Sequence, residues 1–80
     1  MIRLTKHAEE AIEKRSISLV WVIRAVTAPD RNTPDPRDPE RTRSYKAIAE
    51  FGGRVLRVVH RPDNGDIVII TAHFDRGVKS

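Results

Sequence analysis

Hydrophobic and polar positions alternate with a period of two along the last half of the chain, which predicts strands there. β-branched runs occupy residues 54–60 and 66–74, and the turn sequence Asp63-Asn64-Gly65 lies between them, so these two runs predict a β-hairpin. A third strand is predicted over residues 44–51, with Tyr45 and Phe51 on a face that we expect to join the core.

The first third of the chain has a helical period instead. Thr5 is a good N-cap for a helix over residues 6–15, since its hydroxyl can accept from the free N–H groups of the first turn. Ser16-Ile17-Ser18 breaks that helix, and a second follows over residues 18–27. We expect the second helix to bury the apolar residues that recur at its helical spacing, which are Leu19, Val22, Ile23 and Val26.

Together with a short strand at Ile2-Arg3-Leu4, these elements follow the order β-α-α-β-β-β. That order predicts an α+β fold in which two N-terminal helices pack on one face of an antiparallel sheet. We expect a single domain over residues 1–80. Residues 28–42 contain four of the five prolines and almost no apolar side chain, and they predict a flexible loop.

The length of the hairpin turn decides which side chains share a face. A turn of two or four residues places Arg57 with Val68 and Phe74, whereas an odd turn places it with Thr71 and His73. We favour the odd turn because it gives one apolar face and one mixed polar face. The sequence leaves both registers open.

Composition narrows the functional classes. There is no cysteine, which excludes a disulfide, a thiolate zinc site and a cysteine nucleophile. No apolar run approaches the ~20 residues that cross a bilayer, and no secretory signal follows Met1, so we expect a cytoplasmic protein. Net charge is +4, and the segment 30–43 is balanced with four acids and four bases, so the excess lies on the ordered elements. A basic body suits a polyanion partner, although +4 is also ordinary for a soluble small domain.

The string from Leu4 to Ser18 resembles the opening of the DUF4258 family of small prokaryotic proteins, and residues 53–59 and 66–71 resemble its closing strands. The family has no settled function, but its layout is similar to that of BrnT-type toxins and, more distantly, RelE-like ribonucleases. The resemblance implies a metal-independent ribonuclease without a cofactor, held by an antitoxin-like partner or as a homodimer. Two positions depart from the pattern: Ser16 stands where glycine is common, and Ala11 where relatives often carry a basic residue.

Metal-independent RNA cleavage needs a base for the 2′-hydroxyl, an acid for the 5′-oxygen and cations for the charge on phosphorus. His7 and His73 are our candidates for proton transfer, because the ordinary histidine pKa lies near 6.5. Arg57, between two valines, is the third catalytic candidate. The residues that we expect to bind nucleic acid are Lys46, Arg54, Arg57 and Arg61.

Each candidate also has a structural interpretation. His7 could cap or pack the first helix, and Arg57 could pair with Glu50 across the neighbouring strand. His60 stands close to the turn and is a weaker candidate. The spacing of the three histidines matches no zinc pattern, so we expect no metal site.

The leading hypothesis is therefore a cytoplasmic, toxin-like module that acts on RNA as a metal-independent endoribonuclease. The alternative is a non-enzymatic module of the same fold that binds nucleic acid or protein. A third interpretation is a purely structural dimerisation domain. An exposed Trp21 would mark a dimer or antitoxin surface.

Overall fold

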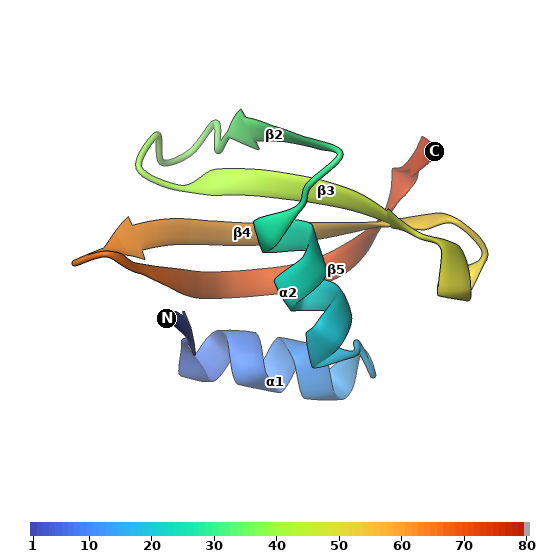
Figure 1. Cartoon of the computed structure of the whole chain (residues 1–80), viewed down its shortest axis with the longest axis horizontal. Coiled ribbons are helices and arrows are strands. Elements are labelled where there is room, and N and C mark those ends of the chain that lie inside the picture. The colour runs from blue at the N-terminus through green and yellow to red at the C-terminus, as the bar shows by residue number, and fades with distance from the viewer. Residues whose placement is uncertain (80) are drawn as a thin grey trace.

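The computed structural model describes residues 1–79, with side chains described as far as Asp75. Two helices and a five-stranded sheet form an α+β fold, as predicted (Figure 1). The strands are β1 (Ile2–Leu4), β2 (Arg31–Pro34), β3 (Thr42–Ile48), β4 (Arg54–Asp63) and β5 (Asp66–Lys79). The helices are α1 (Lys6–Lys14) and α2 (Leu19–Thr27), and a short 3-10 helix, Ala49–Phe51, follows β3. Neither α-helix of this described part is long and apolar enough to cross a membrane.

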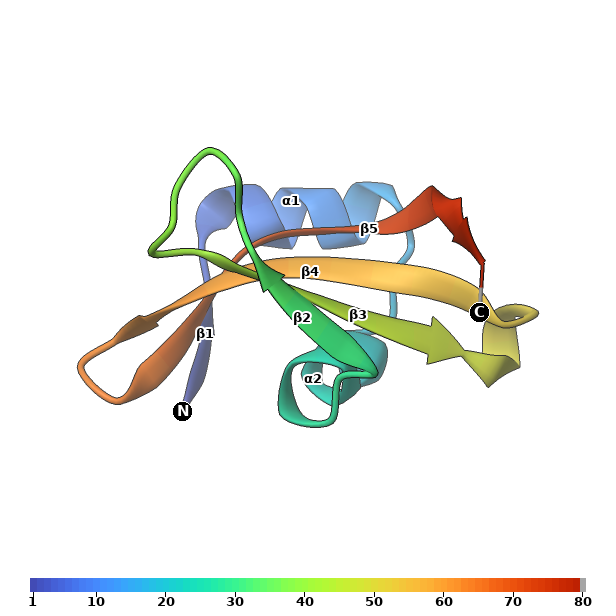
Figure 2. The same ribbon diagram turned by 90° about the horizontal axis from the view of Figure 1, so that it is seen from above.

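The sheet is mixed, so the expectation of a purely antiparallel sheet is wrong. Its order is β1-β5-β4-β3-β2, and β1 runs parallel to β5 while the other pairs are antiparallel. Backbone bonds from Ile67 N–H to Met1 (2.9 Å) and from Thr5 N–H to Ile69 (3.1 Å) join β1 to β5. After β1, the chain forms α1, which runs along the same edge of the sheet (Figure 2).

The region predicted as a flexible loop contains strand β2, which pairs with β3 from Arg31 opposite Tyr45 to Pro34 opposite Thr42. That part of the prediction is wrong. The strand is polar and ends in a proline, which is tolerated at a sheet edge but is a poor strand signal in a sequence. A backbone bond from Asp35 N–H to the Arg41 carbonyl (2.9 Å) closes the connection to β3.

Both helices begin close to where the sequence places them. The Thr5 hydroxyl accepts from the Ala8 N–H at 3.0 Å, which confirms the predicted cap of α1. The apolar stripe of α2 is only partly as predicted, because Val22 is buried while Leu19 and Ile23 are 46% and 39% exposed. Ala25 takes their place, since its small side chain lets the helix lie close to the sheet.

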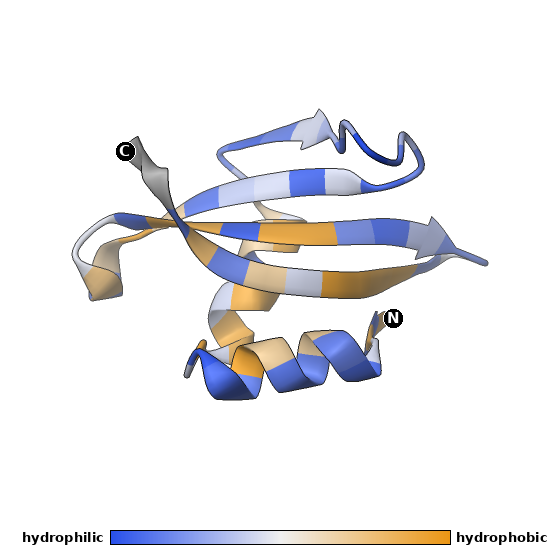
Figure 3. Cartoon of the chain, turned by 180° about the vertical axis from the view of Figure 1, so that it is seen from behind, coloured by the Kyte–Doolittle hydropathy of each residue, from blue (hydrophilic) through white to orange (hydrophobic). Residues whose placement is uncertain are grey.

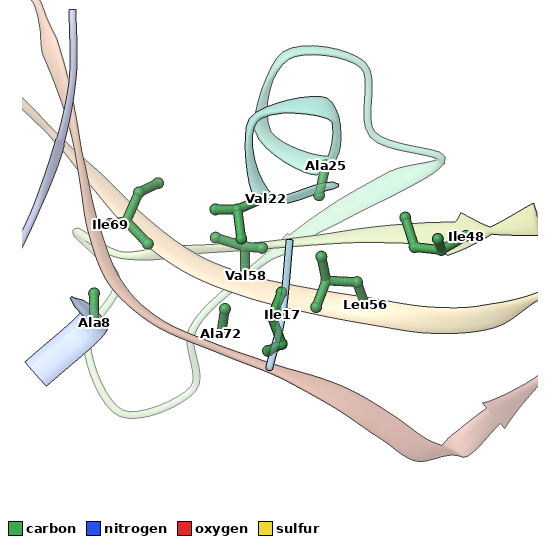
Figure 4. Packing of buried hydrophobic residues seen from close by; sticks show 9 residues of the cluster. All are labelled: Ala8, Ile17, Val22, Ala25, Ile48, Leu56, Val58, Ile69 and Ala72. Atoms are coloured by element: carbon green, nitrogen blue, oxygen red, sulfur yellow. The ribbon is translucent and has the colours of Figure 1, made fainter. Parts of the chain in front are cut away.

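One apolar core joins the helices and the sheet. Helix α1 packs chiefly on β5 and β1, and α2 on β3 and β4. Figure 3 shows the apolar residues concentrated on α2, β4 and β5, whereas β2 and its loop are hydrophilic. The buried cluster drawn in Figure 4 consists of Ala8, Ile17, Val22, Ala25, Ile48, Leu56, Val58, Ile69 and Ala72.

The hairpin turn has two residues, Asn64 (φ 50°) and Gly65 (φ 82°), so the odd turn that we favoured is wrong. The predicted grouping is nevertheless confirmed, because Arg57 pairs with His73. A register shift reconciles the two: Val59 pairs with Thr71 and His60 with Ile69, leaving Ile70 as the extra residue of a β-bulge. Beyond the bulge the alternation inverts, so Ile67 and Ile69 pack in the main apolar cluster in place of Val68 and Ile70, although Val68 is still buried at 5% exposure.

Candidate active site on the sheet face

Three side chains form a row across the centre of the sheet, on the face opposite Leu56 and Val58. Tyr45 on β3 lies opposite Arg57 on β4, and Arg57 lies opposite His73 on β5. Neighbouring strands are about 4.8 Å apart, so the backbones of the outer two residues are about 10 Å apart. We call this set the tyrosine–arginine–histidine row. It places one cation between two groups that can transfer protons.

Arg57 is held by its neighbours on β5. Its Nη2 donates to Nε2 of His73 at 2.5 Å, and its Nη1 lies 3.6 Å from a carboxylate oxygen of Asp75. Only 23% of the Arg57 side chain is exposed. The predicted pairing of Arg57 with Glu50 is wrong. Glu50 instead accepts a bidentate pair of hydrogen bonds from Arg24, with 2.9 Å between each Nη atom and its carboxylate oxygen. That guanidinium lowers the pKa of Glu50 to about 2.

His73 is a neutral imidazole in this arrangement. Burial lowers its pKa, and the positive charges of Arg57, Arg15 and Arg43 lower it further, against the opposing effect of Asp75. Because Nε2 accepts from Arg57, the ring proton lies on Nδ1. A histidine with this environment is unprotonated at neutral pH, as a general base must be.

Tyr45 is 6% exposed and lies beneath the guanidinium of Arg31, which stacks 4.2 Å from its ring centroid. Burial raises the pKa of the phenol, but hydrogen bonding with Arg57, Arg43 and Thr33 outweighs burial and leaves the pKa below its ordinary value. The expectation that Tyr45 is buried is confirmed, but the expectation that Phe51 lies on the same strand face and joins the core is wrong, because Phe51 lies in the 3-10 helix and is 40% exposed. The Tyr45 hydroxyl belongs to the polar face, however, and that makes it a member of the site.

The second cation beside the row is Arg43, whose Nε lies 3.8 Å from Asp35, too far for a hydrogen bond. Among the described residues, the buried Nε atoms of Arg41, Arg43 and Arg57 have no hydrogen-bond partner. Buried donors without a partner are rare in proteins and call for an explanation. Arg43 and Arg57 lie beside or in the row, where an anionic ligand would supply an acceptor once their guanidinium groups turn towards it.

The other candidate histidines lie elsewhere. His7 is exposed in the first turn of α1, and it is Arg15, just beyond the other end of that helix, that approaches His73. Eight residues of helix span about 12 Å. The structure therefore does not bring His7 to the row. His60 lies on the opposite face, where its Nε2 is 2.7 Å from the Ser44 hydroxyl and burial lowers its pKa.

The cations that we expected to bind nucleic acid do not form one patch. Lys46 is 3.3 Å from Asp30, and Arg54 stacks over the rings of Phe51 and Phe74. Arg61 is half-buried opposite Val68 near the hairpin turn. Arg57 is the member of that group that lies in the row. The described residues contain no group of three or more side chains able to hold a metal ion.

A comparison with models of known protein families confirms the family resemblance that the sequence indicates. Residues 4–74 match the family described as a domain of unknown function, DUF4258, and the match covers nearly the whole chain. The protein therefore belongs to the DUF4258 family. Searches of curated proteins and of solved structures found no significant match.

Proposed function

We propose that this protein is a metal-independent endoribonuclease, a toxin-like module with a layout similar to BrnT-type and RelE-like ribonucleases. The observation that supports it is the tyrosine–arginine–histidine row. In-line cleavage requires a base and an acid on opposite sides of the phosphorus, with positive charge at its oxygens. Arg57 is flanked by His73 on one side and Tyr45 on the other.

The proposed reaction follows from these positions. Arg57 turns from His73 to the scissile phosphate, with Arg43 beside it, and frees Nε2 of the imidazole. His73 then takes the proton of the 2′-hydroxyl, and the 2′-oxygen forms a bond to phosphorus. The bond from phosphorus to the 5′-oxygen breaks, and the Tyr45 phenol gives its proton to that oxygen. The products are a 2′,3′-cyclic phosphate and a 5′-hydroxyl.

A regulatory partner is part of the proposal. An antitoxin-like protein or a second copy of the chain would contact the exposed apolar residues of α2, which are Leu19, Val20 and Ile23. Exposed apolar side chains gathered on one helix are typical of protein contact surfaces. We place the activity in the cytoplasm, where RNA substrates are found.

The test is cleavage of a labelled single-stranded RNA by the purified protein in the presence of EDTA. We expect a cyclic-phosphate product that is lost in His73→Ala and Arg57→Met and reduced in Tyr45→Phe. Arg37→Ala is the matched charge control, because Arg37 is exposed in the loop after β2. His7→Ala tests the candidate that the sequence suggested, and we expect it to remain active.

Two outcomes would contradict the proposal. Cleavage lost in folded His7→Ala but kept in His73→Ala would move the active site to α1. Absence of cleavage at high concentration of folded protein, with salt-sensitive RNA binding, would favour the non-enzymatic binding module instead.

A further inference from the structure

A pocket of about 640 Å³ lies at the end of the sheet where α1 ends and β4 begins. Its size falls within the range of about 300–1,000 Å³ that is typical of small-molecule sites. His73 lines this pocket and also belongs to the row, so the two sites share a wall. Apart from Ser16, the rest of the lining consists of aromatic and cationic residues that lie far apart in the sequence.

Three of the four aromatic residues of the chain form the apolar wall. The ring centroids of Phe51 and Phe74 are 4.8 Å apart, and Trp21 lies 5.8 Å from Phe51 and 6.1 Å from Phe74. Phe51 is 40% exposed, so the wall has a face open to solvent. Aromatic rings with an open face are the surfaces on which unpaired bases stack.

The charged wall carries only positive charge. Arg15 and Arg54 line the pocket, and no carboxylate does so among the described residues. The Arg54 guanidinium lies 5.1 Å from the Phe51 centroid and 5.8 Å from that of Phe74, which fixes it over the rings. Stacking uses the face of a guanidinium and leaves its N–H groups, which lie in the plane, able to bind an oxyanion.

We propose that this pocket binds one nucleotide of a single-stranded RNA, with its base against Trp21 and Phe51 and its phosphate at Arg15 and Arg54. The inference rests on the proposed function in taking RNA as the polymer. The pocket would then seat the nucleotide next to the scissile phosphate, because His73 borders both sites. It would select unpaired strands, since a base in a duplex cannot offer its face to a protein ring.

The test uses the single tryptophan of the chain as a reporter. Adenosine monophosphate is titrated into the full chain while Trp21 emission is followed, with adenosine and inorganic phosphate as separate probes. We expect saturable quenching by the nucleotide, weaker binding of adenosine and weakest binding of phosphate. Phe51→Ala and Arg54→Ala should each weaken nucleotide binding by about 10-fold or more, as loss of a stacking contact does elsewhere.

Arg37→Ala serves as the control for the pocket substitutions, because it removes an exposed arginine outside the pocket. It should bind the nucleotide as the unaltered protein does. Absence of saturable quenching, or equal affinity in Phe51→Ala and Arg54→Ala, would overturn the inference. Phosphate that binds as tightly as the nucleotide would also overturn it.

The same titration separates this inference from the proposed function. Nucleotide binding without RNA cleavage would support the nucleotide pocket and contradict the ribonuclease proposal. RNA cleavage without nucleotide binding, unaffected by Phe51→Ala, would support the ribonuclease and contradict the nucleotide pocket. If Trp21 emission changes with protein concentration but not with nucleotide concentration, the pocket is covered by a second copy of the chain. That result would overturn the proposal.

Discussion

Replacement of Arg57 by methionine should leave the free energy of unfolding nearly unchanged while it abolishes RNA cleavage. Arg57 stands between Val55 and Val59 on the central strand, where a charged residue needs either a structural partner or a ligand. Methionine keeps an unbranched apolar stem in that position and removes the guanidinium. The substitution therefore separates the two roles.

The expected magnitude follows from the contacts of the guanidinium. The substitution removes hydrogen bonds to His73 and to the Tyr45 hydroxyl and a half-buried pair with Asp75 at 3.6 Å, which together contribute roughly 1–3 kcal/mol. It also removes a buried Nε that has no partner, a group whose burial costs about 1–3 kcal/mol. These contributions oppose each other, so the net change should lie within about 1 kcal/mol of zero.

Urea unfolding followed by Trp21 fluorescence measures this difference. Leu56→Ala is the control on the same strand, because Leu56 is fully buried and its truncation should cost about 2–5 kcal/mol. The loss expected for Leu56→Ala is large against the ~4–12 kcal/mol expected for a domain of this size, whereas that expected for Arg57→Met is small. A loss above about 2 kcal/mol in Arg57→Met would show that the guanidinium holds the sheet together, and would refute the reasoning that treats it as a ligand-binding group.

Three further predictions concern the turn and the ionisable groups. Gly65→Ala should destabilise the protein by about 1 kcal/mol in urea unfolding, because its φ of 82° disfavours a side chain even though no atom lies near the new Cβ; an unchanged midpoint would contradict the left-handed turn. The pKa values of His60 and His73 are lowered on folding, so stability should fall as pH drops from about 6.5 through the folded-state values, and a flat profile over that window would argue against both shifts. In Arg57→Met the pKa of His73, followed by NMR, should rise, because a nearby positive charge is lost while Asp75 remains; an unchanged value would place Arg57 away from the imidazole.

Local signals in the sequence were enough for much of the fold. The Thr5 cap, the break before α2 and the position of the turn at Asn64-Gly65 are each set by neighbouring residues and are predicted correctly, although the favoured turn length is wrong. The bulge at Ile70 could not be found, because residues 67–70 are all β-branched and any of them fits a regular strand equally well. Strand β2 was also missed, since it exists only through pairing with β3.

The candidate site could be predicted in part, because local alternation is visible in a sequence whereas pairing between distant strands is not. Arg57 and His73 were selected from alternation within the hairpin, and the structure brings them together. Tyr45 was assigned to the core because a single strand does not reveal which face carries a hydroxyl. Its spacing of two residues from Arg43 was the available signal, since two residues so spaced share a strand face.

The ends of the sheet bear on how this protein behaves at high concentration. An unpaired strand edge is a template on which further chains add and aggregate. Here β2, one outer strand, is four residues long, polar and terminated by Pro34, which lacks the N–H that an incoming strand would need. At the other edge, Arg3 of β1 is tied to Asp63 and Asp66 at 2.6 and 3.2 Å, and α1 follows along β5. We therefore expect exchange of Pro34 for a β-branched residue to promote fibrous assembly before it affects folding.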